Sequence, residues 1–306
     1  MATMTSADLG AAIRAGLDHI VSPQVKYKAD NAVYKKVFHF MTEKKKGYIE
    51  DQIFSDLGVL SIKPQGGSIS FDKAPATFFK RYTFLSYAGG IKITMEARDD
   101  NLYNSQIKRE GPLLAQAEAE TREIISANVF NRAFNASYTG ADGKELCATN
   151  HPFYKGGTWS NELTIPGSLN PVNLEQACIE ITKWKSESGN FLSYMPDKLV
   201  FPTDLMFDAD RIINSPMQYN TANHTKNTLA NKFPGGLISW SHLTDTKAWF
   251  ILTNYDKRSG LNFIERMAPK IETDSDFGTK DWLYSLVTRY EASWTDPHII
   301  FGSAGA

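Results

Sequence analysis

Apolar and polar side chains alternate most clearly near the C-terminal end of the chain, between residues 284 and 294. The apolar side chains of one face are Tyr284, Leu286, Tyr290, Ala292 and Trp294. The opposite face is polar except for Val287. A period of two is that of a β-strand with one buried face. We therefore predict that the chain closes on a packed strand that completes a sheet.

The longest helical pattern lies between residues 99 and 135. Asp99 and Asp100 suit the N-cap and first turn of a short helix, which Gly111 and Pro112 interrupt. Pro112 then suits the first turn of a second helix, which runs to about Asn135. Its narrow apolar stripe contains Leu114, Ala117, Thr121, Ile125, Val129 and Ala133. A stripe rich in alanine favours close packing of this helix against a sheet.

Residues 51–98 have a pattern typical of strands and turns. The apolar stretches that predict strands are 59–62, 69–71, 77–87 and 91–96, and the turns or breaks between them are 63–68 and 89–90. We interpret the segment as a long two-stranded excursion followed by a return strand. Because an isolated hairpin is only marginally stable, such an excursion needs a neighbour to lie on.

Shorter patterns predict the remaining elements. Helices are expected over 171–184 and 204–214, and buried strands over 198–203 and 249–253. The Gly- and Pro-rich stretch 135–170 is expected to be a loop. Loops of this length in a compact domain are uncommon and often functional.

The first 50 residues predict a short helix and then an arm. Leu9, Ala12, Ile13 and Leu17 share one helical stripe, and Pro23 ends the helix. The arm that follows has aromatic residues spaced among charged ones: Tyr27, Tyr34, Phe38, Phe40 and Tyr48. This spacing is a poor basis for a core of its own, so we expect the arm to lie along another surface.

Composition excludes several classes of protein. The chain of 306 residues has 33 basic and 34 acidic residues, a formal charge of −1, which does not favour DNA binding as the main activity. The run Lys44–Lys46 is interpreted as a solvated face. Two cysteines are too few for a disulfide framework, and no apolar run is long enough to span a membrane. No signal peptide is recognisable, so we expect a protein made in the cytoplasm.

Candidate chemistry is sparse. None of the six histidines has metal-ligand spacing, and Cys147 with His151, four residues apart in a loop, defines no nucleophile–base geometry. Carboxylate clusters that could serve a hydrolase are Asp99, Asp100, Asp274 and Asp276. The first two also suit a helix cap and the last two a turn. We assign no catalytic, cofactor-binding or metal-binding residue and do not expect an enzyme, although a cytosolic hydrolase using these acids stays open.

Several segments in order resemble one family. They are residues 81–100, 111–125, 142–152, 156–161, 199–205, 209–215, 245–252 and 289–303. Together they resemble the major capsid proteins of tailed phages, which have the HK-97 fold, and within them the Mu-like major head subunit branch. The closing segment departs from the family pattern at His298 and Ile299.

This resemblance implies an α+β fold with an N-terminal arm, an extended β-hairpin loop, a peripheral domain with a long spine helix, and an axial domain. The implied boundaries are 1–50 for the arm, 51–98 for the extended loop and return strand, 99–160 for the peripheral domain with its spine helix, 161–258 for the axial domain, and 259–306 for the closing strands of the peripheral domain. The expected function is a major capsid protein that self-assembles into an icosahedral shell around the phage genome.

The resemblance also implies partners and a location. The subunit would form pentamers and hexamers with itself, and would meet scaffolding, portal and decoration proteins as well as packaged double-stranded DNA on the inner surface. It would be made in the host cytoplasm and reside in the virion, without membrane contact. Some relatives cross-link subunits through a lysine. Lys63, Lys73 and Lys80 lie in or near the expected loop, but no acceptor is recognisable. An encapsulin-type shell that stores cargo is the alternative of the same fold.

Overall fold

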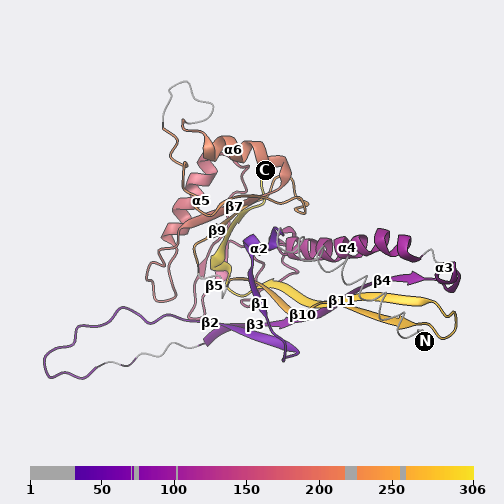
Figure 1. The fold of residues 1–306 in the computed structure, drawn as a ribbon. Coiled ribbons are helices and arrows are strands. Elements are labelled where there is room, and N and C mark those ends of the chain that lie inside the picture. Colours follow the sequence, from indigo (N-terminus) through magenta and orange to yellow (C-terminus); the bar gives the residue numbers. More distant parts are fainter. Residues whose placement is uncertain (1–31, 70, 72–75, 101–102, 218–225, 256–259) are drawn as a thin grey trace.

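The computed structural model describes residues 32–69, 71, 76–100, 103–217, 226–255 and 260–306. Figure 1 shows an elongated lobe, which contains helix α4 and strands β4, β10 and β11, and a wedge-shaped lobe, which contains α5, α6, β7 and β9. A long loop between β2 and β3 projects away from both lobes. Within the described part of the chain, no helix combines the length and apolar character needed to cross a bilayer.

A four-stranded sheet forms the elongated lobe. Its order is β1 (His39–Thr42), β10 (Leu261–Ser275), β11 (Trp282–Trp294) and β4 (Leu85–Ile93). Strand β1 runs parallel to β10, and the other pairs are antiparallel. The alternation expected in the closing strand is confirmed, because Tyr284, Leu286 and Tyr290 of β11 are all buried.

Helix α4 (Tyr103–Asn131) lies along this sheet (Figure 1). The prediction of two helices separated at Gly111 and Pro112 is wrong, because α4 continues through both residues. An interior proline costs one backbone hydrogen bond, and the long packed segment that follows Pro112 outweighs this loss. Asp99 is the last residue of a separate short helix, α3 (Met95–Asp99), and its role as an N-cap for the helix that follows stays a prediction.

The buried face of α4 also differs from the predicted stripe. From Pro112 onward, where its side chains are described, the buried ones are Ala115, Glu118, Arg122, Ser126, Ala127, Val129 and Phe130. Ala117, which the stripe placed inside, is exposed. A search for apolar positions could not find this face, because two of its central members are charged.

A second four-stranded sheet forms the wedge-shaped lobe. Its order is β12 (Ile300–Ser303), β9 (Trp249–Thr253), β7 (Pro196–Phe201) and β8 (Gly236–Ser239). The helices of this lobe are α5 (Pro171–Lys183), α6 (Met206–Asn214) and the 3-10 turn η1 (Thr203–Leu205), as the sequence patterns predicted. Strand β12 was expected among the closing strands of the elongated lobe. It pairs with β9 instead, after the 3-10 turn η3 (Pro297–Ile299) redirects the chain.

The extended hairpin is formed by β2 (Tyr48–Phe54) and β3 (Ala76–Thr83). The strands expected at 59–62 and 69–71 are not present, since the described residues from 55 to 71 form no strand. The expected break at Gly89 and Gly90 is also absent, because β4 runs through both glycines in register with β11. A short pair, β5 (His151–Pro152) and β6 (Thr158–Trp159), lies in the long loop after α4.

Part of the predicted arm belongs to the core of this same chain. Tyr34, in the short helix α2 (Tyr34–Val37), and Phe38 are only 1% and 3% exposed. The expectation that the aromatic residues of the arm need another surface is therefore wrong for these two. Tyr48 is 49% exposed, so for this residue the expectation stays a prediction. The predicted helix over residues 9–17 and Tyr27 lie outside the described residues.

Candidate functional site

The extended loop, residues 55–71, is the most exposed apolar segment of the described chain. Leu60, Ile62 and Phe71 are 89%, 96% and 92% exposed. Val59 and Ile69 are also largely uncovered. Monomeric proteins rarely leave contiguous apolar side chains this exposed, and such patches mark contact sites for other molecules.

The base of the loop is fixed to the body by a chain of buried hydrogen bonds. Tyr82 of β3 donates its hydroxyl to Thr295 Oγ1 at 2.6 Å, and Thr295 donates in turn to Asp51 Oδ2 of β2 at 2.7 Å. Asn262 Nδ2 donates to the Tyr82 hydroxyl oxygen at 3.2 Å. Burial raises the pKa of Tyr82, so this hydroxyl stays protonated. Both strands of the hairpin are thereby joined to the end of β11.

Asp56 ties the first residues of the loop to the wedge-shaped lobe. Its Oδ2 accepts hydrogen bonds from Ser186 Oγ at 2.6 Å and from Asn190 Nδ2 at 3.2 Å. Burial opposes ionisation of this carboxyl, but the hydrogen bonds from Ser186, Ser188 and Asn190 outweigh it and lower the pKa of Asp56. The loop therefore leaves the body from a point that is anchored to both lobes.

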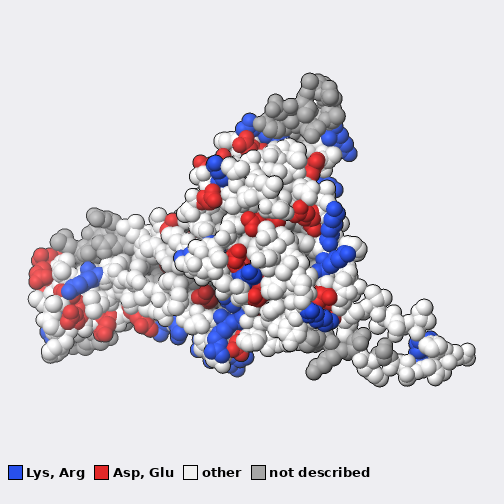
Figure 2. Space-filling view, turned by 180° about the vertical axis from the view of Figure 1, so that it is seen from behind, with Lys and Arg blue, Asp and Glu red and all other residues white. Residues whose placement is uncertain are grey.

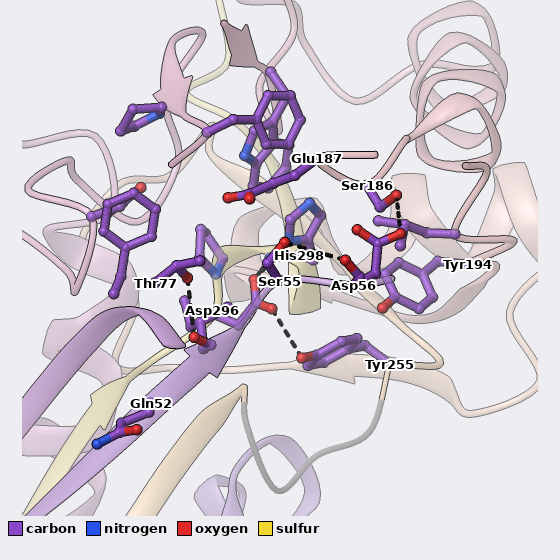
Figure 3. Close-up of a pocket in the computed structure, with 18 residues that line it drawn as sticks. Gln52, Ser55, Asp56, Thr77, Ser186, Glu187, Tyr194, Tyr255, Asp296 and His298 are labelled. Atoms are coloured by element: carbon purple, nitrogen blue, oxygen red, sulfur yellow. Dashed lines mark hydrogen bonds and ion pairs between the residues drawn. The ribbon is translucent and has the colours of Figure 1, made fainter. Parts of the chain in front are cut away.

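A cavity of about 350 Å³ lies at this anchoring point (Figure 3). Its walls come from β2, β3, the long loop after α4, the turn at residues 186–194 and the turn before β12. Four carboxylates line it: Asp56, Asp142, Glu187 and Asp296. Among the described lining residues none is a lysine or arginine, so the described part of the wall is acidic. It is referred to below as the base cavity.

His298 lines the base cavity and contacts both an aromatic ring and a carboxylate. Its ring stacks on Trp159 with centroids 3.7 Å apart, and its Nδ1 lies 2.7 Å from Asp296 Oδ1. Asp296 also accepts a hydrogen bond from the Tyr255 hydroxyl at 2.9 Å. Burial opposes the charge of Asp296, but the contacts with His298 and Tyr255 lower its pKa below the usual range. The position where the sequence departs from the family pattern is thus a packed part of this cavity.

The cysteine–histidine pair considered from sequence has no catalytic geometry. Both ring nitrogens of His151 are engaged, Nδ1 with Asp142 at 2.6 Å and Nε2 with Asn161 Oδ1 at 3.0 Å. Burial raises the pKa of Cys147 well above its ordinary value, and that of Cys178 to about 11. Neither thiol is ionised at neutral pH, and a protonated thiol is a poor nucleophile.

The carboxylates considered for a hydrolase have local structural roles where the structure describes them. Asp276 Oδ1 accepts the backbone N–H of Gly278 at 2.8 Å in the turn between β10 and β11, and these contacts lower its pKa. Asp274 lies near the end of β10 and bonds the next backbone N–H. Asp99 and Asp100 lie at the end of α3. Within the described ranges, no group of three or more His, Cys, Asp or Glu side chains is placed to hold a metal ion.

The three lysines near the loop have different surroundings. Lys63 is exposed on the extended loop, and Lys73 lies outside the described residues. Lys80, on β3, donates to the Thr139 carbonyl at 2.8 Å and lies 5.4 Å from the Trp294 ring centroid. Burial lowers the pKa of Lys80, and burial raises the pKa of the neighbouring Glu291 to about 7. These contacts hold β3 against the end of β11.

An ionic network under α4 was missed from sequence. Arg122 is paired with Glu118 one turn earlier on the helix, and its Nη1 lies 2.8 Å from Glu265 Oε2 of β10. Its Nη2 donates to Thr288 Oγ1 of β11 at 3.2 Å. Only 4% of the Arg122 and Glu118 side chains is exposed. A Glu-x-x-x-Arg spacing on a helix is the one sequence signal for this pair, but it is usually a surface feature.

Comparisons with known proteins agree with this architecture. A family model described as phage capsid protein matches residues 79–298. No curated protein matches the chain. Among solved structures, the virus-like particle from Pyrococcus furiosus is similar with a TM-score of 0.53 at 11% identity, over 94% of this chain and 98% of that one.

Two phage structures are similar to a comparable degree. The capsid of bacteriophage JBD30 has a TM-score of 0.55 at 14% identity, over 69% of this chain and 90% of that one. The capsid of the cyanophage P-SCSP1u has a TM-score of 0.53 at 11% identity, over 90% of this chain and 88% of that one. At these identities the similarity shows the fold alone, which is HK-97-like. The assignment to the Mu-like branch stays a prediction. Because the family match spans more than half of its residues, the chain belongs to the phage capsid protein family.

Proposed function

We propose that the chain is the major head subunit of a tailed phage, and that pentamers and hexamers of it build an icosahedral shell around the genome. The observation that supports this is the extended loop, whose apolar side chains have no cover within the described chain. Burying one such side chain gives about 1.5–3 kcal/mol. In a shell, a neighbouring subunit would bury these apolar side chains, and the same would be true of every copy.

The partners follow from this role and are part of the proposal. Scaffolding protein would act during shell formation, a portal would occupy one vertex, and decoration proteins would bind outside. Packaged DNA would meet the inner surface through non-specific contacts. The formal charge of the whole chain is −1, which gives no strong attraction to the phosphates of DNA. We therefore expect these DNA contacts to be weak. Synthesis would take place in the host cytoplasm, before assembly.

The test is electron microscopy of the purified protein and of a variant with a shortened loop. Residues 57–75 are replaced by two glycines, which keeps Asp56 and both strands of the hairpin. A larger deletion, over 62–86, would remove Tyr82 and Phe84, which are 1% and 4% exposed, and would unfold the base. We expect uniform shells from the natural sequence, and a folded, unassembled subunit from the variant.

Two further measurements make the test specific. The double substitution Leu60→Ser and Ile62→Ser removes apolar surface without changing the length of the loop. The control is Ile165→Ser, which changes an apolar residue that is 81% exposed but lies outside the loop, between β6 and α5. Only the double substitution should prevent assembly. Normal shells from the shortened variant would refute the role of the loop. Shells from the natural host that enclose protein cargo and no nucleic acid would favour a cargo compartment over a phage head.

A further inference from the structure

A histidine and a carboxyl group meet well inside the body of the subunit. Charged side chains of both signs are interspersed over the surface of both lobes, as the face in Figure 2 shows. The side chains of His151 and Asp142, in contrast, are only 0% and 5% exposed. His151 Nδ1 lies 2.6 Å from Asp142 Oδ2. Ionisable groups are rarely buried this completely unless they are paired, and the neighbouring hydrogen bonds determine where the protons of this pair are.

Asn161 determines the state of the other ring nitrogen. Its side-chain Nδ2 donates to three carbonyl oxygens, those of Leu146, Pro297 and Ile300. Its Oδ1 accepts the backbone N–H of Ala148 at 2.8 Å, so the amide cannot be turned over without losing these bonds. The same Oδ1 lies 3.0 Å from His151 Nε2. Because an amide oxygen only accepts hydrogen bonds, His151 Nε2 must have a proton.

A second proton is needed on the opposite side of the ring. A neutral ring with its proton on Nε2 would turn the bare lone pair of Nδ1 toward the Asp142 carboxylate. Asp142 Oδ1 also accepts the backbone N–H of Lys144 at 3.2 Å, and the charge of Lys80 attracts the same carboxyl group. Both interactions favour the ionised form of Asp142. The second proton is therefore on Nδ1, and His151 is a buried imidazolium that donates from both nitrogens.

The surroundings of the ring suit a positive charge. The indole of Trp159 stacks on His151 with centroids 4.8 Å apart, and the face of an indole attracts cations. Glu162 is a further carboxyl group whose charge acts on His151. The opposite face of the indole is covered by His298, which is paired with Asp296 (Figure 3). A change in pH at this place therefore has to be assigned to one histidine or the other.

The proton of His151 acts on the junction between the two lobes. The chain leaves the first sheet at Trp294 and enters the second at Ile300. Asn161 joins this junction to the long loop after α4, through its side chain and through its carbonyl oxygen, which accepts the N–H of Gly302 at 2.9 Å. If His151 lost one proton, a bare nitrogen would face either the Asn161 oxygen or the Asp142 carboxylate. Either contact would be repulsive and cut off from water.

We propose that His151 is a proton-dependent latch, which holds the loop 142–161 on the junction 295–302 while both ring nitrogens have protons and releases it when one proton is lost. The proton passes from Nδ1 to water, and no other bond forms or breaks. The role of His151 is one of positioning, since it acts through Asn161. The latch belongs to the single subunit and does not depend on the proposed function.

Nuclear magnetic resonance and hydrogen exchange on the full-length protein test the latch. With ¹⁵N-labelled histidine, a ring nitrogen that has a proton is distinguished from a bare one by its chemical shift, and His151→Gln identifies the signal. Amide exchange of peptides from 142–161 is followed as the pH is raised, with correction for the intrinsic effect of pH on exchange. We expect loss of the proton and loss of protection to share one midpoint. A ring with a bare nitrogen while the loop stays protected would overturn the proposal.

Asp142→Asn separates the latch from a general effect of pH. The asparagine amide can donate to Nδ1 of a neutral ring, whose Nε2 still donates to Asn161, so the second proton is no longer needed. We expect the loop of this variant to stay protected at the pH at which the natural sequence loses protection. Retention of the natural pH dependence, which His298 and Asp296 alone would cause, would contradict the latch. So would a loop that is unprotected at every pH.

Asp245→Asn is the matched control. Asp245 is exposed and, like Asp142, accepts the backbone N–H two residues further along the chain, that of Lys247 at 2.9 Å. The substitution makes the same chemical change in the same kind of turn, away from His151. We expect the loop 142–161 of this variant to lose protection at the same pH as in the natural sequence. A shift equal to that of Asp142→Asn would show that the effect is one of net charge, and would overturn the proposal.

Discussion

Removal of the Arg122 guanidinium should be among the most damaging single changes to the folded subunit. The side chain is 4% exposed and is in contact with two carboxylates, Glu118 and Glu265, from a helix and a strand. It also lies 5.1 Å from the centroid of the Tyr290 ring. Arg122→Met retains most of the apolar stem and removes the charge. Two carboxylates would then face one another without a cation.

The magnitude follows from the burial of these groups. Breaking a buried ion pair by removing one partner costs about 3–5 kcal/mol, against a total stability of about 5–15 kcal/mol for a typical protein. Burial already raises the pKa of Glu118, which shows how poorly this site accommodates an unpaired negative charge. Arg122→Lys should lose less, since an ammonium retains the charge but cannot reach both carboxylates and Thr288 together.

Urea unfolding of the unassembled subunit, followed by tryptophan fluorescence and circular dichroism, measures these differences. A triple variant, Glu118→Leu, Arg122→Met and Glu265→Met, is the decisive companion. Since buried ion pairs are often replaced by apolar groups at little cost, it should recover most of the stability that Arg122→Met loses. A loss below about 1 kcal/mol for Arg122→Met, or a triple variant as unstable as the single one, would refute the reasoning.

Three further changes have defined outcomes. Burial raises the pKa of Glu291 to about 7, so the stability that is present below its unfolded pKa is lost as pH rises through 7. Relative to the natural sequence, Glu291→Gln should therefore be more stable at pH 8 but not at pH 4. Equal pH dependence of the two proteins in urea unfolding would contradict this. Gly302→Ala would place a Cβ 2.6 Å from Cys147 Sγ and should cost about 1–3 kcal/mol by overpacking, part of which Cys147→Ala should restore in thermal melts. Tyr82→Phe leaves the buried Thr295 hydroxyl without its donor and should cost about 1–3 kcal/mol; an unchanged melting temperature would rule out a structural role for this bond.

Elements with strong local signals could be predicted from the sequence. Helix α5 begins at Pro171 after Asn170, whose side chain accepts the N–H of Asn173, and both residues are ordinary signs of a helix start. Strand β11 was predictable because one of its faces is buried from Tyr284 to its end at Trp294. In both cases the information lies within a dozen neighbouring residues.

Features that depend on distant residues could not be predicted. The base cavity joins Asp56, Asp142, Glu187 and Asp296, which only the folded chain brings together. Nothing local indicates that the chain changes sheets between Trp294 and Ile300, because the reversal depends on the 3-10 turn and the buried Asp296. Pro112 misled the helix prediction for a related reason, since tertiary packing outweighed a local penalty.

The distribution of strands between the two sheets has a consequence for the order of synthesis. Strand β1 pairs with β10 across most of the chain, His39 opposite Asn262, and β12 completes the other sheet at Ser303. The first sheet cannot close until translation has passed Trp294, and the second cannot close until it has passed Ser303, so a growing chain has neither sheet complete until close to that point. Folding through such non-local contacts is slow. A ribosome-bound chain is thereby kept out of a growing shell, and only completed subunits compete for places in it.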